Sequence, residues 1–203
     1  MPMQASEAAA ALDRRLTRLQ RTARKVERSF DDGSLTRTDL EALYEGLFIG
    51  AVVAFERFIE SLFTGIVLNR VVYAGGRIVP RIDVRSAGVL EPLLNAGRSY
   101  ADWLPYHETE KKANVYLRGG RPFTDVGATE KQRMDRWLWT RNAIAHASKH
   151  SVRVFTDNVI AGTPLPPRER TPAGFLRSEL RPGVTRFENA LDEMRGVAAT
   201  LCR

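Results

Sequence analysis

The stretch Leu47-Phe48-Ile49-Gly50-Ala51-Val52-Val53-Ala54-Phe55 decides the fold, because it is apolar on nearly every side of a helix. A helix of this kind is surrounded by other helices, so the stretch predicts the central helix of a bundle. The helical pattern begins near Thr38, where Glu41 three residues later predicts a capping box, and it runs to about Asn69. Charged residues within 56–60 interrupt the apolar run, so the pattern does not predict a membrane span.

Four further segments have apolar residues at three- and four-residue steps, which is the pattern of helices with one buried face. These segments are residues 4–30, 129–146, 148–160 and 184–201. Thr129 is expected to cap the second of them. Residues 71–128 combine Gly- and Pro-rich turns with two short helical patterns. The sequence therefore predicts an all-α protein with four to six helices around one core.

Composition bounds the environment and the partners. Lys and Arg number 31 against 24 Asp and Glu, which gives a formal net charge of +7 and permits binding to a polyanion such as RNA. The single cysteine, Cys202, excludes a disulfide within the chain. Residues 1–11 lack the basic and apolar regions of a signal peptide, so we expect a cytoplasmic protein without membrane attachment.

Chemistry is concentrated in Trp137-Leu138-Trp139-Thr140-Arg141-Asn142-Ala143-Ile144-Ala145-His146. The chain has only three histidines, and it has no HExxH, CxxC or Gly-rich phosphate-binding motif. We therefore expect neither a metal nor a cofactor. The spacing of Arg141, Asn142 and His146 on a strong helical pattern is the feature that points to a function.

This motif resembles the nuclease members of the HEPN superfamily, in which Arg is commonly followed by Asn and, after four to six residues, by His. A second similarity is Glu56, because related families often have an acidic residue on the long helix facing the motif. The resemblance covers residues 37–70 and 129–150 and is most similar to stand-alone bacterial HEPN proteins. It implies an all-α bundle of four or five helices. The length of 203 residues fits one domain over 1–203, and the helical patterns place its core at 5–70 and 129–203, with an insert at 71–128 and a C-terminal helical extension.

The resemblance also implies an activity, metal-independent RNA cleavage by a homodimer that meets through the motif helix. A neutral imidazole at His146 can take the proton of a ribose 2′-hydroxyl, and Arg141 can stabilise the phosphate. Asn142 would orient His146 or the phosphate. Arg141 lies five residues before His146, or roughly 140° around a helix, so a second subunit would help to focus the site.

Other interpretations of these residues stay open. Lys149, His150 and Arg57 are candidate RNA contacts, and more commonly such side chains are only solvated. His146 could instead be a core histidine bonded to Glu56. The chain could be a non-catalytic RNA- or nucleotide-binding module that works with another protein, or a helical scaffold. As a ribonuclease it would suit a toxin with an antitoxin or operon partner, or a phage-defence effector.

Overall fold

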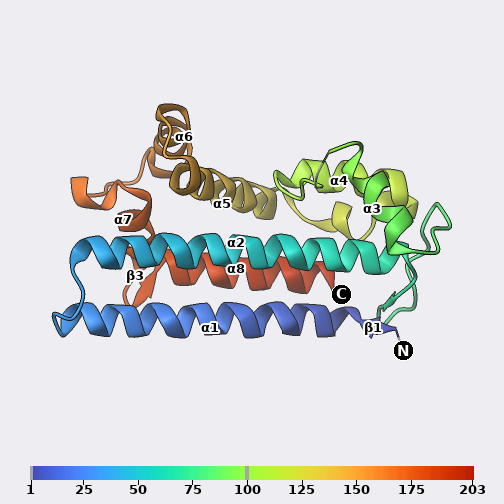
Figure 1. The fold of residues 1–203 in the computed structure, drawn as a ribbon, viewed down its shortest axis with the longest axis horizontal. Helices are drawn as coiled ribbons and strands as arrows, with labels where there is room; N and C mark the ends of the chain where they lie inside the picture. Colours follow the sequence, from blue (N-terminus) through green and yellow to red (C-terminus); the bar gives the residue numbers. More distant parts are fainter. Residues whose placement is uncertain (1, 99–100) are drawn as a thin grey trace. The chain divides into compact units, whose positions relative to one another are not determined.

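The computed structural model is dominated by helices and describes residues 2–98 and 101–203 (Figure 1). The α-helices of these residues are α1 (Ala5–Asp31), α2 (Arg37–Val67), α3 (Ala87–Asn95), α4 (Tyr106–Tyr116), α5 (Ala128–His146), α6 (Lys149–Phe155), α7 (Pro172–Arg177) and α8 (Arg186–Leu201). The strands are short: β1 (Met3–Gln4), β2 (Val71–Val72), β3 (Glu179–Arg181) and β4 (Val184–Thr185). β1 pairs with β2 in parallel, and β3 pairs with β4 in antiparallel orientation. The prediction of an all-α fold is confirmed.

Contacts divide the chain into two compact units. Unit 1 contains Met1–Asp13, Phe55–Asp135 and Arg195–Arg203, and unit 2 contains Arg14–Ala54 and Arg136–Met194. α1, α2, α5 and α8 each contribute residues to both units. The prediction of one domain over residues 1–203 stays a prediction. The motif lies entirely in unit 2.

An aromatic cluster organises the core of unit 1. The ring of Phe63, on α2, lies 5.2 Å from Trp103 and 5.3 Å from Phe123, measured between ring centroids. Tyr106, the first residue of α4, donates its hydroxyl hydrogen to the Phe123 carbonyl oxygen at 2.9 Å. Residues 71–128, which the sequence suggested as an insert, thus supply much of the aromatic core of this unit.

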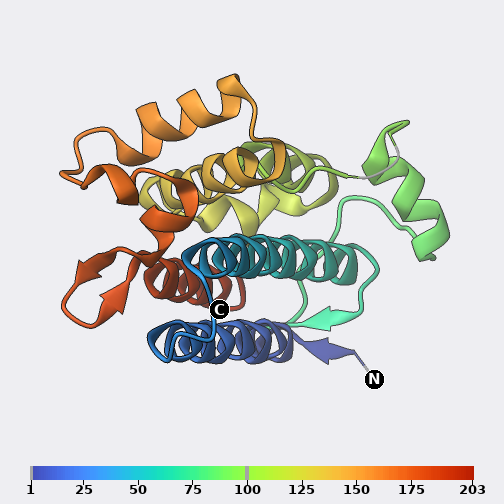
Figure 2. The same cartoon turned by 60° about the vertical axis from the view of Figure 1, so that its left-hand side comes forward.

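Unit 2 is a layered arrangement of helices in which α2 lies between α5 and α1 (Figures 1 and 2). The part of α1 in this unit buries Leu16, Leu19, Ala23 and Val26, which are the apolar positions of the predicted stripe. The arginines of the other face are exposed, and they are Arg14, Arg15, Arg18, Arg21 and Arg24. The ring of Tyr44, on α2, meets the ring of Phe187, on α8, edge to face with 5.6 Å between the ring centroids.

The start of α2 corrects the predicted cap. The helix begins at Arg37, so Thr36 and not Thr38 holds the N-cap position. The backbone N–H of Asp39 donates to Thr36 Oγ1 at 3.2 Å, and the Thr36 N–H donates back to Asp39 Oδ2 at 3.0 Å. Glu41 pairs instead with Arg37. Within residues 2–98 and 101–203, no helix is both long and apolar enough to span a membrane.

Candidate functional site

The motif occupies the last turns of α5. The helix begins at Ala128, so Thr129 lies within the first turn and not at the cap position that the sequence suggested. It ends at His146, as predicted, because Ala147 takes a left-handed backbone conformation with φ of 44°. A non-glycine residue in that region stops a right-handed helix. His146 is therefore the last residue of the helix that carries the motif.

Two of the three predicted catalytic side chains, Arg141 and Asn142, are hydrogen-bonded to each other. The Arg141 Nη1 group donates a hydrogen bond of 2.9 Å to Asn142 Oδ1, and both side chains are half-buried. His146 is exposed, which excludes the alternative of a core histidine. Five residues of helix separate Arg141 from His146 by roughly 140° around the axis. The roles of these side chains in catalysis stay predictions.

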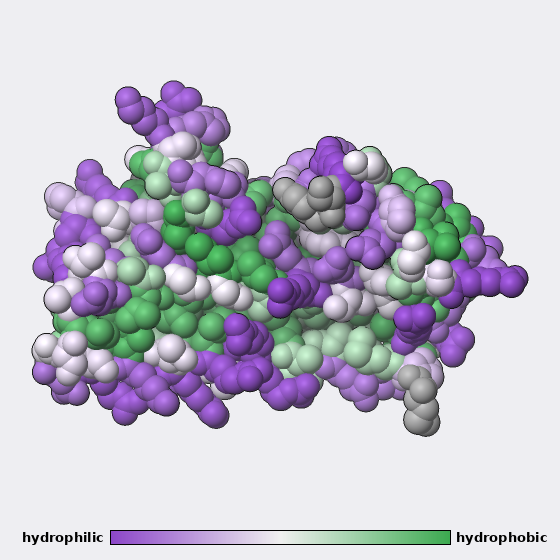
Figure 3. Space-filling model, viewed as in Figure 1, coloured by the Kyte–Doolittle hydropathy of each residue, from purple (hydrophilic) through white to green (hydrophobic). Residues whose placement is uncertain are grey.

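The beginning of α6 places two further predicted RNA contacts, Lys149 and His150, close to the motif in sequence. Ser148 is the N-cap: its hydroxyl accepts a hydrogen bond from the Ser151 N–H at 3.1 Å, and the Ser151 hydroxyl accepts one from the Ser148 N–H at 3.1 Å. This capping box fixes where α6 starts. Lys149 and His150, in its first turn, are both exposed. Hydrophilic residues gather over α6 in the space-filling view (Figure 3).

One residue of the motif, Ala143, packs against buried apolar side chains. Ala143 is buried in a cluster with residues of α6 and the segment after it. The members of this cluster are Ala143, Phe155, Val159, Ile160 and Leu165. Trp139 packs against the cluster, and Trp137 is buried, with its indole N–H donating to Glu193 Oε2 at 3.1 Å. Both tryptophans therefore pack against other side chains of the protein.

The predicted supporting residues of α2 lie in unit 1. The Glu56 side chain is half-buried there, and Arg57 is exposed. Their predicted roles beside the motif, as supporting carboxylate and as RNA contact, stay predictions. Among residues 2–98 and 101–203, no group of three or more His, Cys, Asp or Glu side chains forms a candidate metal centre.

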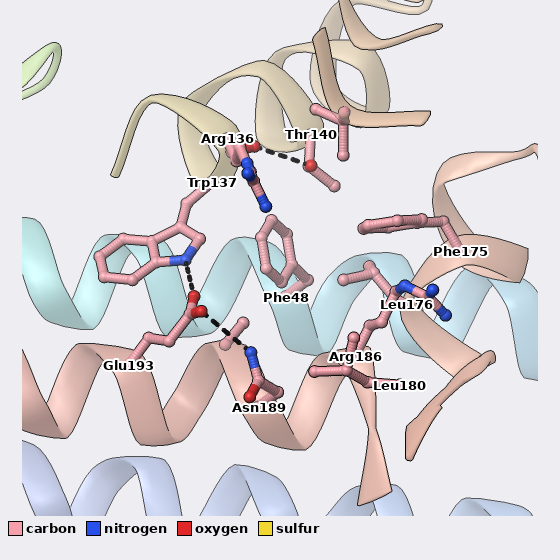
Figure 4. Close-up of a pocket in the computed structure, with 12 residues that line it drawn as sticks. Phe48, Arg136, Trp137, Thr140, Phe175, Leu176, Leu180, Arg186, Asn189 and Glu193 are labelled. Carbon is pink, nitrogen blue, oxygen red and sulfur yellow. Dashed lines mark hydrogen bonds between the residues drawn. The ribbon is translucent and has the colours of Figure 1, made fainter. Parts of the chain in front are cut away.

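A cavity of about 150 Å³ in unit 2 is a feature that sequence reasoning missed (Figure 4). Its lining comes from α2, α5, α7, α8 and the segments beside them. The residues are Phe48, Arg136, Trp137, Thr140, Val159, Phe175, Leu176, Leu180, Arg186, Asn189, Ala190 and Glu193. Arg136, Trp137 and Thr140 lie on α5 within the five residues before Arg141. No spacing in the sequence predicts such a cavity, because its walls come from separate segments.

Comparison with known proteins identifies no relative of the chain. No family model, curated protein or solved structure matches it. The HEPN resemblance of the Arg141–His146 motif therefore stays a prediction drawn from the sequence. A function for this chain has to be inferred from its own residues and their arrangement.

Proposed function

We propose that the chain is a metal-independent endoribonuclease that acts as a homodimer on RNA. The observation that carries this proposal is the exposure of His146 at the end of α5, one turn and a half beyond an Arg141 that Asn142 holds in place. Lys149 and His150, both exposed, come within four residues of it, and the chain carries a formal net charge of +7. An exposed imidazole with a lysine nearby suits contact with a phosphodiester.

The reaction needs only groups that the RNA and these side chains supply. His146 accepts the proton of a ribose 2′-hydroxyl, and the resulting oxygen attacks the adjacent phosphorus. The bond from phosphorus to the 5′-oxygen breaks, and that oxygen takes up the proton that His146 had accepted, which returns His146 to its neutral form. The remaining end is a 2′,3′-cyclic phosphate. Arg141 stabilises the negative charge that develops on the phosphate oxygens, and DNA is not a substrate because it lacks the 2′-hydroxyl.

A second copy of the chain completes the site. Within one chain, Arg141 and His146 project from different sides of α5, since five residues correspond to roughly 140°. A two-fold axis through two motif helices brings Arg141 of one subunit toward His146 of the other. Isologous two-fold packing is the commonest arrangement of homo-oligomers. Ala143 is already buried within unit 2, so Ala145 and Ala147, both exposed, are the small residues left to allow close approach.

Mixing two inactive variants tests both the activity and its shared site. Arg141→Ala and His146→Ala are each expected to be inactive on RNA. When equal amounts are mixed and subunits exchange, half of the dimers combine one subunit of each kind. Such a dimer has one intact composite site and one empty site, so the mixture recovers about a quarter of wild-type activity. A mixture that stays inactive, beside an active wild-type dimer, contradicts a shared site.

The same assay separates the alternatives. Wild-type protein that binds RNA in a salt-dependent manner and leaves it uncut would identify a non-catalytic RNA-binding module. Cleavage that survives His146→Ala would exclude the proposed base.

We further propose that the ribonuclease acts in the cytoplasm as a toxin or phage-defence effector, inhibited by an antitoxin or operon partner. Expression of the wild-type chain is then expected to arrest growth, and His146→Ala is not.

A further inference from the structure

The cavity of unit 2 has no role in the proposed cleavage, and its shape and chemistry suggest a ligand of its own. One wall is apolar: Phe48 of α2 lies opposite Phe175 and Leu176 of α7 (Figure 4). Val159, Leu180 and Ala190 extend this wall. The cavity as a whole is lined by both apolar and polar side chains, and its volume of about 150 Å³ leaves room for one benzene-sized ring.

The carboxylate in the cavity is already held by the protein. Glu193 accepts a hydrogen bond from Trp137 Nε1 at 3.1 Å through Oε2 and one from Asn189 Nδ2 at 3.0 Å through Oε1. These two donors fix its position and share its negative charge. Glu193 is therefore part of the wall, and it does not require a cationic ligand.

One of the two arginines of the cavity, Arg186, is also hydrogen-bonded to the protein. Arg186 Nη1 donates to Ser178 Oγ at 2.7 Å and to the Glu179 carbonyl oxygen at 2.8 Å. Its guanidinium carbon lies 5.2 Å from the ring centroid of Phe175, which is the distance of a cation–π contact. These contacts hold Arg186 and the Phe175 ring in place before any ligand arrives.

The second arginine is the open polar group. The Arg136 side chain extends from α5 toward Phe48 (Figure 4). Arg136 is exposed at the edge of the cavity, and within the described part of the chain its guanidinium makes no hydrogen bond and no ion pair with another side chain. Arginine keeps its charge at all physiological pH values and offers a planar pair of N–H donors that matches a carboxylate. The cavity thus combines space for one aromatic ring with the guanidinium of Arg136, which is available to bind an anion.

From this combination we infer that the cavity binds a small aromatic carboxylate. The ring lies between Phe48 and Phe175, and the carboxylate accepts two hydrogen bonds from Arg136. The apolar wall supplies affinity for the ring, and Arg136 supplies the preference for an anion over a neutral ring of the same size. Binding of this ligand does not depend on RNA cleavage.

Calorimetric titration with benzoate and with benzyl alcohol tests this preference on the full-length chain. Benzoate is expected to bind about tenfold more tightly than benzyl alcohol, because hydrogen bonds to a charged group are worth about that factor. Arg136→Met removes the charge and keeps the apolar stem, so the benzoate affinity is expected to fall to that of benzyl alcohol. The benzyl alcohol affinity is expected to stay within about twofold. Arg153→Met, at an exposed arginine of α6 outside the cavity, is the matched control and is expected to change neither affinity.

Two measurements locate the binding. Ala190→Leu adds bulk inside the cavity and is expected to abolish binding of both probes, with far-UV circular dichroism as the check on folding. In the wild-type chain, which needs no substitution to fold, benzoate is expected to shift the indole N–H signal of Trp137, identified by its loss in Trp137→Phe. No saturable shift at millimolar benzoate would overturn the inference. Equal effects of Arg136→Met and Arg153→Met on benzoate affinity would overturn it as well.

Discussion

The ion pair between Arg177 and Glu27 is expected to be a main source of stability in unit 2, and replacing Arg177 by Met tests this. Arg177 Nε and Nη2 donate to the two oxygens of Glu27 at 2.9 and 3.0 Å. The two side chains are only 23% and 30% exposed. The guanidinium carbon also lies 5.4 Å from the ring of Phe30 and 5.9 Å from that of Tyr44. The pair thus joins α1, α2 and α7.

The magnitude can be worked from this geometry. Arg177→Met breaks two charge-assisted hydrogen bonds and leaves Glu27 half-buried without its cation. We expect a loss of about 2–3 kcal/mol in the free energy of unfolding, after allowing for partial exposure. The control is Arg37→Met, which breaks a pair with Glu41 whose side chains are 48% and 31% exposed. That substitution is expected to cost about 0.3–0.5 kcal/mol. Urea denaturation followed by circular dichroism measures both, and equal losses from the two variants would refute the reasoning.

Three further predictions use the same measurement. Burial raises the pKa of Glu27, but hydrogen bonds from Arg177 and Tyr44 outweigh it and hold that pKa below its ordinary value of 4.5. The stability that Glu27 contributes is therefore complete above about pH 4.5 and is lost as the pH falls through the lower folded value, so the advantage of wild type over Glu27→Gln should shrink only in acid. Thr36→Ala removes the N-cap of α2 and is expected to cost about 1 kcal/mol, whereas an unchanged midpoint would place the cap elsewhere. Phe155→Ala removes a buried ring from the apolar cluster that contains Ala143, and it is expected to lower the free energy of unfolding by about 3–5 kcal/mol. A loss below about 1 kcal/mol would contradict that packing.

The sequence predicted those elements whose patterns are long and strongly periodic. Residues 47–55 are apolar all round and lie within α2, and the apolar stripe of α1 is buried where the spacing placed it. The end of α5 at His146 was also predicted correctly. The cap of α2 was not, because Thr36 with Asp39 and Thr38 with Glu41 share the same spacing. The buried Leu40, four residues after Thr36, is at the position that a hydrophobic staple requires and favours the earlier pair.

The spacing of residues in the sequence did not predict the short elements or the cavity. α7 begins with Thr171 as its cap and Pro172 in its first turn, which is a helix-start signal, yet six residues are too few to show a period. The hairpin of β3 and β4 turns through Gly183 with φ of 74° and was assigned in part to the last helix. The cavity depends on tertiary packing of separate segments. Arg136 is exposed in the structure as well, so nothing in the sequence distinguishes it from the other charged residues of α5.

The most direct test of the central claim is the chemistry of the RNA ends that the purified chain produces. Wild-type protein in excess EDTA is incubated with a single-stranded RNA of mixed sequence and with the matching DNA, and the products are identified by mass spectrometry. We predict 2′,3′-cyclic phosphate and 5′-hydroxyl ends from RNA, no cleavage of DNA, and no products from His146→Ala. RNA left intact by a folded wild-type dimer, or products with 5′-phosphate ends, would contradict the proposed cleavage.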